Sequence, residues 1–221
     1  MEIDFTHWKT EFTGMVTREF GARIVCAGVQ GSRARGEARE TSDIDAVLLL
    51  DALTQNDLLN YHALVHRLPY AERMCGFVSG KAELLAWDAA DLVSFYFDTD
   101  CLIGSLEFLR PRVTPEAARR SVHLSACGLY HALCHAAVFE AEPLSAETVA
   151  KSAFFLLRTR EYQRTGVYPL RLSELLPLHD PEERALLAPL SGMRPGKANN
   201  VFDAAAALDW CSRMIVCCSD A

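Results

Sequence analysis

The chain has 221 residues, half of them hydrophobic and 23% charged, which is the composition of a folded protein with a sizeable core. Its formal net charge of -7 argues against bulk nucleic-acid binding through a basic surface, and equally against a polybasic membrane-surface protein. Residues 1–110 carry 10 basic and 17 acidic side chains, whereas residues 111–221 carry 12 of each. This asymmetry predicts two functional parts.

The eight cysteines lie mostly inside apolar runs and form no CxxC pair. We therefore expect reduced thiols, most of them acting as small buried hydrophobic side chains. The segment MEIDFTHWKTEF is polar and acidic, unlike a signal peptide, and no apolar run reaches the roughly 18–20 residues needed to span a bilayer. These features predict a cytoplasmic protein with no membrane partner.

The first half of the chain alternates between helical and strand-like patterns. Residues 4–20 have apolar side chains at helical spacing, and Gly21 is expected to end this helix. Short apolar runs predict strands at 22–29 and 43–50, and a third strand at 70–78. Helices are expected at 54–67 and 81–98, although SFYF within the latter also suits a strand. This order predicts an α/β unit around a small sheet.

The segment RPRVTP marks the expected domain boundary, because prolines flank it and the composition changes there. We expect a domain at 1–110 and a second at 111–221, with helices at 115–139, 145–164 and 200–218 and a loop at SGMRPGKANN. The predicted fold class is α+β, with a small mixed-sheet domain followed by a C-terminal helical bundle. The active site is expected in the cleft between the domains.

The informative segment runs from Gly31-Ser32 to Asp43-Ile44-Asp45. Asp43 and Asp45 are two apart on a strand, so they project to the same face. Adjacent carboxylates repel unless a cation neutralises them, and hard oxygen ligands suit Mg²⁺. Gly31 lets the backbone approach a phosphate, and the Ser32 hydroxyl can donate to its oxygens. The segment therefore predicts a triphosphate and Mg²⁺ site, although it is not a Walker A loop.

The sequence GSRARGEARETSDIDAVLLL resembles the signature of the nucleotidyltransferase superfamily related to DNA polymerase beta. More narrowly, it resembles the minimal and the aminoglycoside nucleotidyltransferases. The resemblance implies an enzyme that transfers a nucleoside monophosphate, with AMP from ATP as the leading case, to a hydroxyl of a small-molecule acceptor. Mg²⁺ is implied as the cofactor, and pyrophosphate leaves.

The resemblance also assigns roles to the residues of the motif. Gly31 and Ser32 would hold the phosphates, and Asp43 and Asp45 would bind Mg²⁺. Two arginines, Arg33 and Arg35, lie in the motif; each could reach a phosphate or be an ordinary surface arginine.

In the family, a third acidic residue on a following strand completes the site. Glu72, on the expected third strand, is our choice for this catalytic and metal-binding role beside Asp43 and Asp45. Alternatively, Glu72 is an exposed glutamate of an edge strand with no role in the site. The other candidates for the third acidic residue are Asp88, Asp91 and Asp98. Cys75 could occupy the position instead, which would leave the site one carboxylate short.

Two further patterns each have a structural and a functional interpretation. The first is a stripe at four-residue spacing, formed by His123, Cys127, His131 and His135. It rotates by about 40° per step, so a packed helix face or part of a substrate cleft is favoured over zinc. The second comprises Lys151, Arg158, Glu161 and Tyr162. It could face the nucleotide, with Glu161 as a base, but a solvated charged face is favoured.

The acceptor is the least determined part of the hypothesis. Five acidic residues and no basic residue lie between Asp88 and Glu107, which suits a cationic acceptor such as an aminoglycoside. One alternative is an antitoxin-like regulatory protein that binds or adenylylates a partner protein. Another is a non-catalytic nucleotide binder, which a missing third carboxylate would favour.

Overall fold

The chain forms two compact units, Met1–Arg112 and Val113–Ala221. The computed structural model describes residues 3–191 and 203–219, the last two by their backbone alone. The first unit contains a mixed sheet with helices, and the described part of the second is helical. The α+β fold class predicted from the sequence is therefore confirmed.

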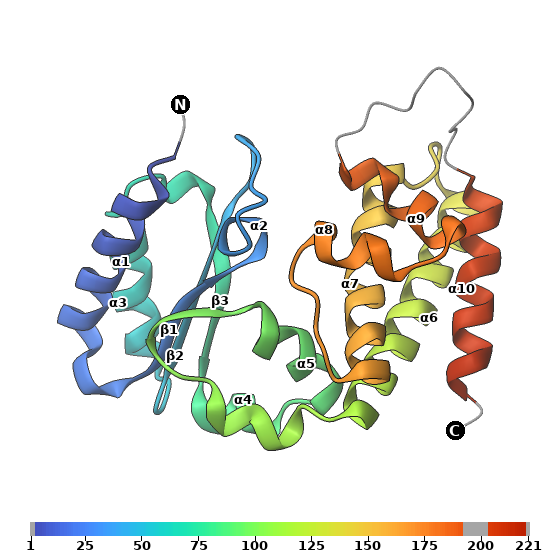
Figure 1. Ribbon diagram of the computed structural model, residues 1–221. Helices are drawn as coiled ribbons and strands as arrows, with labels where there is room; N and C mark the ends of the chain where they lie inside the picture. The colour runs from blue at the N-terminus through green and yellow to red at the C-terminus, as the bar shows by residue number, and fades with distance from the viewer. Residues whose placement is uncertain (1–2, 192–202, 220–221) are drawn as a thin grey trace. The chain divides into compact units, whose positions relative to one another are not determined.

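Four strands form the sheet of the first unit, in the order β3-β2-β1-β4. They are β1 (Ile24–Gln30), β2 (Ile44–Leu50), β3 (Met74–Gly80) and β4 (Asp100–Gly104). β1 runs antiparallel to β2 and β4, and β2 runs parallel to β3. The end of β1 and the starts of the other three strands consequently meet at one end of the sheet (Figure 1).

Helices cover both faces of this sheet (Figure 1). On one face, α1 (Phe5–Phe20) and α3 (Gln55–Val65) bury Trp8 and Phe12 against Val29 and Ile44. The opposite face is covered by α4 (Lys81–Ala86), α5 (Ala89–Asp98) and the 3-10 helix η3 (Glu107–Arg112). Because side chains alternate along a strand, the two apolar clusters draw on alternate residues of β1 and β2.

The part of the first unit that follows β3 differs from the sequence prediction in two ways. The helix expected at 81–98 is divided, because the Asp88 side chain caps α5 by accepting from the Ala90 N–H at 3.0 Å. SFYF is helical, and the strand β4 that follows it was not predicted. The expected helices at 4–20 and 54–67 and the first two strands are confirmed, with shifts of one or two residues at their ends.

The second unit is built around three long helices, α6 (Pro115–Phe139), α7 (Ala146–Thr165) and α10 (Ala204–Ser219) (Figure 1). Two short helices, α8 (Leu172–Leu175) and α9 (Pro181–Leu187), pack on α7. The predicted helices at 115–139 and 145–164 are confirmed. Residues 192–202 lie outside the described residues, and so do most of the expected SGMRPGKANN loop and the start of the last predicted helix.

By length and composition alone, α6 would suffice to cross a membrane. Its buried side chains, however, include Val122, Ala126, Leu129 and Leu133, which pack with residues of α7 and α10 in the core of the helical unit. A helix that buries one apolar stripe in this way is an ordinary member of a bundle.

A buried polar cluster ties α7, α9 and α10 together. The Arg160 guanidinium contacts both carboxylate oxygens of Glu183, at 2.6 and 2.7 Å. Nδ1 of His179 lies 2.7 Å from the same carboxylate, and the Trp210 indole N–H donates to it at 3.2 Å. Glu183 is only 6% exposed, so these partners compensate for its loss of water.

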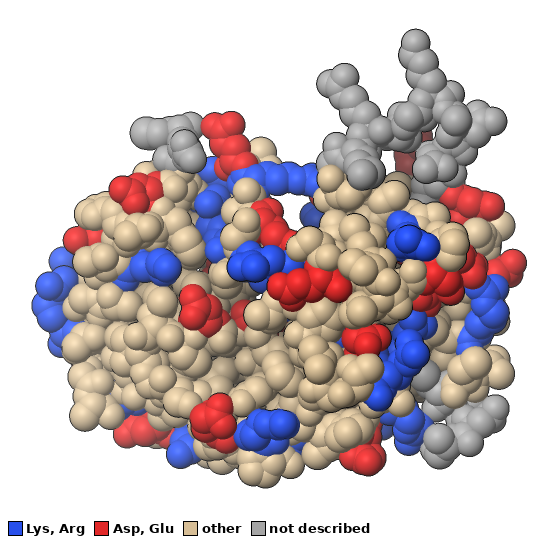
Figure 2. All heavy atoms as spheres, viewed as in Figure 1, with Lys and Arg blue, Asp and Glu red and all other residues tan. Residues whose placement is uncertain are grey.

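On the face drawn in Figure 2, lysine and arginine side chains lie interspersed with aspartate and glutamate over both units. Among the residues that the structure describes, those visible on each unit therefore form no continuous basic surface of the kind that bulk nucleic-acid binding uses.

Candidate nucleotide-binding site

The motif predicted from the sequence lies at the end of the sheet where β1 finishes and β2 begins. Gly31 starts a four-residue helix, α2 (Gly31–Ala34), with a left-handed φ of 73°. A Cβ atom on Gly31 would lie 2.0 Å from Oδ2 of Asp45. The register explains this contact, because Gln30 and Asp45 are cross-strand partners. Only glycine therefore fits between the turn and the carboxylate.

Two arginines hold the loop that leads into β2. Arg33 donates from Nε to the Asp43 carbonyl at 3.0 Å and from a terminal nitrogen to the Ser42 carbonyl at 2.6 Å. Arg73 also donates to the Ser42 carbonyl, at 3.0 Å. Burial and the neighbouring Arg73 charge lower the pKa of Arg33, against the opposing effect of Asp43 and Asp45. The structure thus places Arg33 as a residue that fixes the backbone of Asp43.

The remaining residues around the turn make hydrogen bonds that hold it in place. Arg35 points to Glu37, with Nε 3.1 Å from the carboxylate. Ser32 is half-buried in the first turn of α2, and its carbonyl accepts from the Glu37 N–H at 2.8 Å. Gln30 at the end of β1 donates to the Thr99 hydroxyl at 2.7 Å, which joins this turn to the start of β4.

The third strand is shorter than predicted, and this changes the position of Glu72. Tyr70 adopts a left-handed φ of 61°, and residues 71–73 form a 3-10 turn before β3 starts at Met74. The prediction that Glu72 lies on the strand is therefore wrong, and its side chain is exposed in the turn. The left-handed Tyr70 and the 3-10 turn after it place the start of β3 four residues later than predicted.

Cys75 is the residue of β3 that faces the site. It is the direct partner of Asp45 in the parallel register, and its thiol donates to Oδ1 of Asp45 at 2.9 Å. Partial burial of the sulfur, together with the carboxylates of Asp45 and Asp43, raises the pKa of Cys75 to about 12. The thiol is consequently neutral at physiological pH.

The competing carboxylates of α5 are spread along that helix. Asp88 caps its start and Asp91 lies in its first turn, roughly 15 and 10 Å along the helix axis from Asp98 at its end. Asp100 begins β4 at the same end of the sheet as Asp45. It pairs with Val29, however, whose side chain packs on the face covered by α1 and α3, whereas Asp45 pairs with Gln30 on the opposite face.

The donor atoms determine which cation the site suits. Among the described residues, no three His, Cys, Asp or Glu side chains are placed together to hold a metal ion, so Glu72 does not complete a set with Asp43 and Asp45. Mg²⁺ is commonly held by one or two carboxylates and takes its other ligands from water and substrate phosphates. Asp43 and Asp45 fit that pattern, and they would leave the remaining ligands to water and to substrate phosphates.

Comparison with known proteins agrees with this geometry. Residues 16–73 match the family described as "Nucleotidyltransferase domain", and the match includes Gly31, Ser32, Asp43 and Asp45. The chain carries a nucleotidyltransferase domain. The identification made from the GSRARG and SDID segments is thus confirmed. No curated protein matches the chain.

Two solved structures were found to resemble this chain, to different extents. The spectinomycin adenyltransferase AAD(9) from Enterococcus faecialis, solved with ATP and spectinomycin, is 12% identical, with a TM-score of 0.61 over 96% of this chain and 99% of that one. A toxin-antitoxin structure with AMP-PNP is 17% identical, with a TM-score of 0.36 over 53% of this chain and 90% of that one. The first comparison shows a shared fold along nearly the whole length of both chains.

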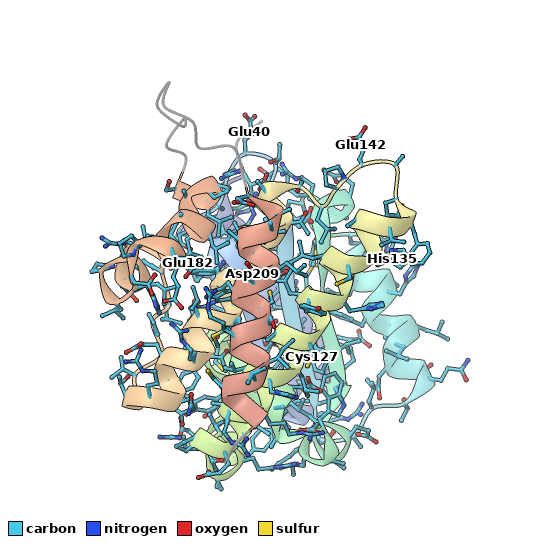
Figure 3. All side chains as sticks on the ribbon, turned by 90° about the vertical axis from the view of Figure 1, so that its right-hand side faces the viewer. Glu40, Cys127, His135, Glu142, Glu182 and Asp209 are labelled. Atoms are coloured by element: carbon cyan, nitrogen blue, oxygen red, sulfur yellow. The ribbon has the colours of Figure 1, made fainter. Side chains whose placement is uncertain are left out.

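Outside the nucleotidyltransferase domain, the histidine stripe of α6 separates into pairs. The Cys127 sulfur lies 3.7 Å from Nε2 of His123, and the rings of His131 and His135 are 6.0 Å apart. His135 and Cys127 lie at different levels of α6, and Glu142 lies on the loop that follows it (Figure 3). This end of α6 borders an open hollow of about 680 Å³, lined by His131, His135, Glu140 and Glu142 among others.

The charged side expected on α7 is largely buried. Arg158 is fully buried, donates to the Pro169 carbonyl at 2.7 Å and lies over the Tyr168 ring. Glu161 and Tyr162 are also buried, and the Tyr162 hydroxyl donates to the Val113 carbonyl at 2.8 Å. The prediction of a solvated charged face is therefore wrong for these three residues, which belong to the interior of the helical unit.

Proposed function

We propose that this protein transfers AMP from ATP to a hydroxyl of a cationic, hydroxylated small molecule of the aminoglycoside type. The observation that carries the proposal is the proximity of Gly31 to Asp45, which brings the turn that would hold phosphate next to a carboxylate that would hold the cation. Proteins that hold a triphosphate through a divalent cation need these two elements side by side.

The chain's own residues would divide the work of binding. Gly31 and Ser32 offer a turn that phosphate oxygens can approach, and Asp43 and Asp45 would hold Mg²⁺. Arg33 and Arg73 keep Asp43 in place through the backbone of the loop. The bound cation would neutralise the two carboxylates and stabilise the charge that develops on the phosphates.

The nature of the acceptor rests on two supports. The similar fold of the spectinomycin adenyltransferase extends over 96% of this chain. The excess of acidic residues in 1–110, especially between Asp88 and Glu107, favours a cationic acceptor over an anionic one.

One observation favours a second function, that of a nucleotide binder without catalysis. Cys75 stands beside Asp45 where a third carboxylate was expected, and its raised pKa makes it a poor base for activating a hydroxyl. In that case the protein would bind ATP and Mg²⁺ with no transfer of AMP.

A pyrophosphate-release assay separates the two functions. The full-length protein would be supplied with Mg²⁺, each of the four nucleoside triphosphates in turn, and a panel of cationic aminoglycosides and matched neutral sugars. The transferase proposal expects release with ATP and a cationic acceptor, together with an acceptor heavier by one AMP in mass spectrometry. ATP binding measured by calorimetry, with no release for any acceptor, would establish the non-catalytic binder.

A further inference from the structure

Two cysteines of the first unit meet across neighbouring strands, away from the nucleotide motif. The Sγ atoms of Cys26 on β1 and Cys101 on β4 lie 3.1 Å apart, and both residues are free thiols. The residues are 75 positions apart in the sequence, so only the folded sheet brings them together.

The register of the strands explains why the sulfurs meet. Cys26 pairs with Gly104 and Cys101 pairs with Gly28, so each cysteine faces a residue without a side chain. The two thiols are therefore diagonal neighbours on one face of the sheet and extend toward each other. A Cβ on Gly28 would lie 2.4 Å from the Asp100 carbonyl oxygen, and one on Gly104 would lie 2.0 Å from that of Val25. Because these two glycines have no side chain, the backbones of β1 and β4 can approach each other closely.

The two thiols have different surroundings. Cys26 is fully buried in the apolar cluster with Leu49 and Leu92, whereas Cys101 is half-buried at the margin of that cluster. The adjacent Cys26 thiol lowers the pKa of Cys101, and the Leu106 backbone N–H acts in the same direction against the effect of burial. Cys101 is thus the more accessible and the more acidic of the two.

We propose that Cys26 and Cys101 form an oxidisable dithiol, which a hydroperoxide converts to a disulfide that links β1 to β4. In the first step the Cys101 thiolate attacks a peroxide oxygen, the O–O bond breaks, and Cys101 becomes a sulfenic acid. With hydrogen peroxide, the leaving hydroxide takes up a proton and departs as water. The Cys26 sulfur then attacks the Cys101 sulfur, the S–O bond breaks, and a second water leaves with the Cys26 proton. The two thiols together lose two electrons, which the peroxide gains.

The proposal is independent of the proposed nucleotidyl transfer, because it rests on the sheet register alone. The sequence led us to expect that most of the cysteines act as small buried hydrophobic side chains; the proposal gives Cys26 and Cys101 a chemical role as well. The remaining motion is small, since the sulfurs must close from 3.1 Å to a bond length of about 2.0 Å.

The test uses the full-length protein, treated with hydrogen peroxide and then with N-ethylmaleimide. Peptide mapping by mass spectrometry is expected to find a peptide containing Cys26 joined to one containing Cys101, with the mass of two hydrogens missing, in protein that stays monomeric on a non-reducing gel. The proposal is overturned if N-ethylmaleimide still labels both cysteines, or if Cys101 is oxidised further without a cross-link.

Thermal unfolding supplies a second measurement with matched variants. Oxidation should raise the Tm of the wild-type protein by about 5 °C or more, since the cross-link closes a long loop. Cys101→Ser should abolish both the cross-link and this rise, whereas Cys217→Ser, which removes an exposed thiol on α10, should keep both. An equal Tm rise in Cys101→Ser would contradict the proposal. Wild-type mapping needs no substitution, so the test stands even if a variant folds poorly.

Discussion

The thiol of Cys75 donates a hydrogen bond to Oδ1 of Asp45, with the sulfur and the oxygen 2.9 Å apart. The second oxygen, Oδ2, lies against the backbone of Gly31. One oxygen of this carboxylate is therefore hydrogen-bonded to β3, and the other lies close to the turn after β1. Asp45 is the centre of the candidate site, and three of the four predictions that follow concern this aspartate or its neighbours.

The first prediction concerns the two motif aspartates. Asp43→Asn and Asp45→Asn should each lower ATP-dependent pyrophosphate release by at least about 100-fold, because each removes a charge that would hold the cation. The measurement is the initial rate under saturating Mg²⁺. Asp209→Asn, which removes an exposed carboxylate of α10 in the helical unit, serves as the control and should retain the wild-type rate. Full activity in both motif variants would rule out this site for the reaction.

The second prediction concerns the base at the position of Cys75. Cys75→Glu should raise the rate of transfer by about 100-fold, a typical contribution of a general base. The rate should then rise with pH through the carboxyl pKa, since only the ionised form accepts a proton. Cys75→Ser keeps a hydrogen-bond donor beside Asp45 and should match the wild type.

The same variants test the raised pKa of Cys75. The wild-type rate should show no step from this thiol in the neutral range, because its pKa of about 12 keeps it protonated there. A wild-type step near neutrality that disappears in Cys75→Ser would show that the thiol itself titrates during the reaction.

The third prediction uses two glycines with the same backbone conformation. Gly31 and Gly36 have φ values of 73° and 72°, but only at Gly31 would a Cβ collide with Asp45. Each change to alanine should destabilise the fold by about 1–2 kcal/mol, the usual cost of a left-handed alanine. Gly31→Ala should in addition weaken Mg²⁺-dependent ATP binding, measured by calorimetry, whereas Gly36→Ala should not. Equal ATP affinities in the two variants would show that the contact with Asp45 has no part in binding.

The positions of the turn and of the two motif aspartates could be predicted because these residues lie close together in one segment; their roles stay a prediction. Gly31, Ser32, Asp43 and Asp45 are placed by two adjacent strands, whose apolar runs are unambiguous. Choosing between Glu72 and Cys75 required the starting point of β3. That point depends on the left-handed turn at Tyr70, for which the local sequence gives no clear signal.

Other features depended on pairings over long distances in the chain. The partnership of Cys26 with Cys101 follows from a register that includes β4, a five-residue strand that directly follows a helix. Helix α9 was also missed, although Asp180 followed by Pro181 and two glutamates is a recognisable helix start. Arg158 could not be identified as buried, because its partner is a backbone carbonyl beyond the end of its own helix.

The fourth prediction concerns the stability of the helical unit at acid pH. Burial alone would raise the pKa of Glu183, but hydrogen bonds from His179, Arg160 and Trp210 outweigh it and lower the pKa to about 2. A carboxyl group with a lowered pKa in the folded state stabilises that state above its unfolded pKa, which is near 4.5. This contribution should be lost as the pH falls from about 4.5 toward 2. Urea unfolding followed by circular dichroism across that range measures the loss.

Glu183→Gln should remove most of this pH dependence and lower the free energy of unfolding near neutrality by about 3–5 kcal/mol, because it leaves the Arg160 charge without its partner. The neighbouring Glu182 is the matched control, since its contact with Arg213 is exposed. Glu182→Gln should change the free energy of unfolding by less than about 1 kcal/mol. If both variants unfolded at the same urea concentration at every pH, the buried cluster would not be the source of the acid sensitivity.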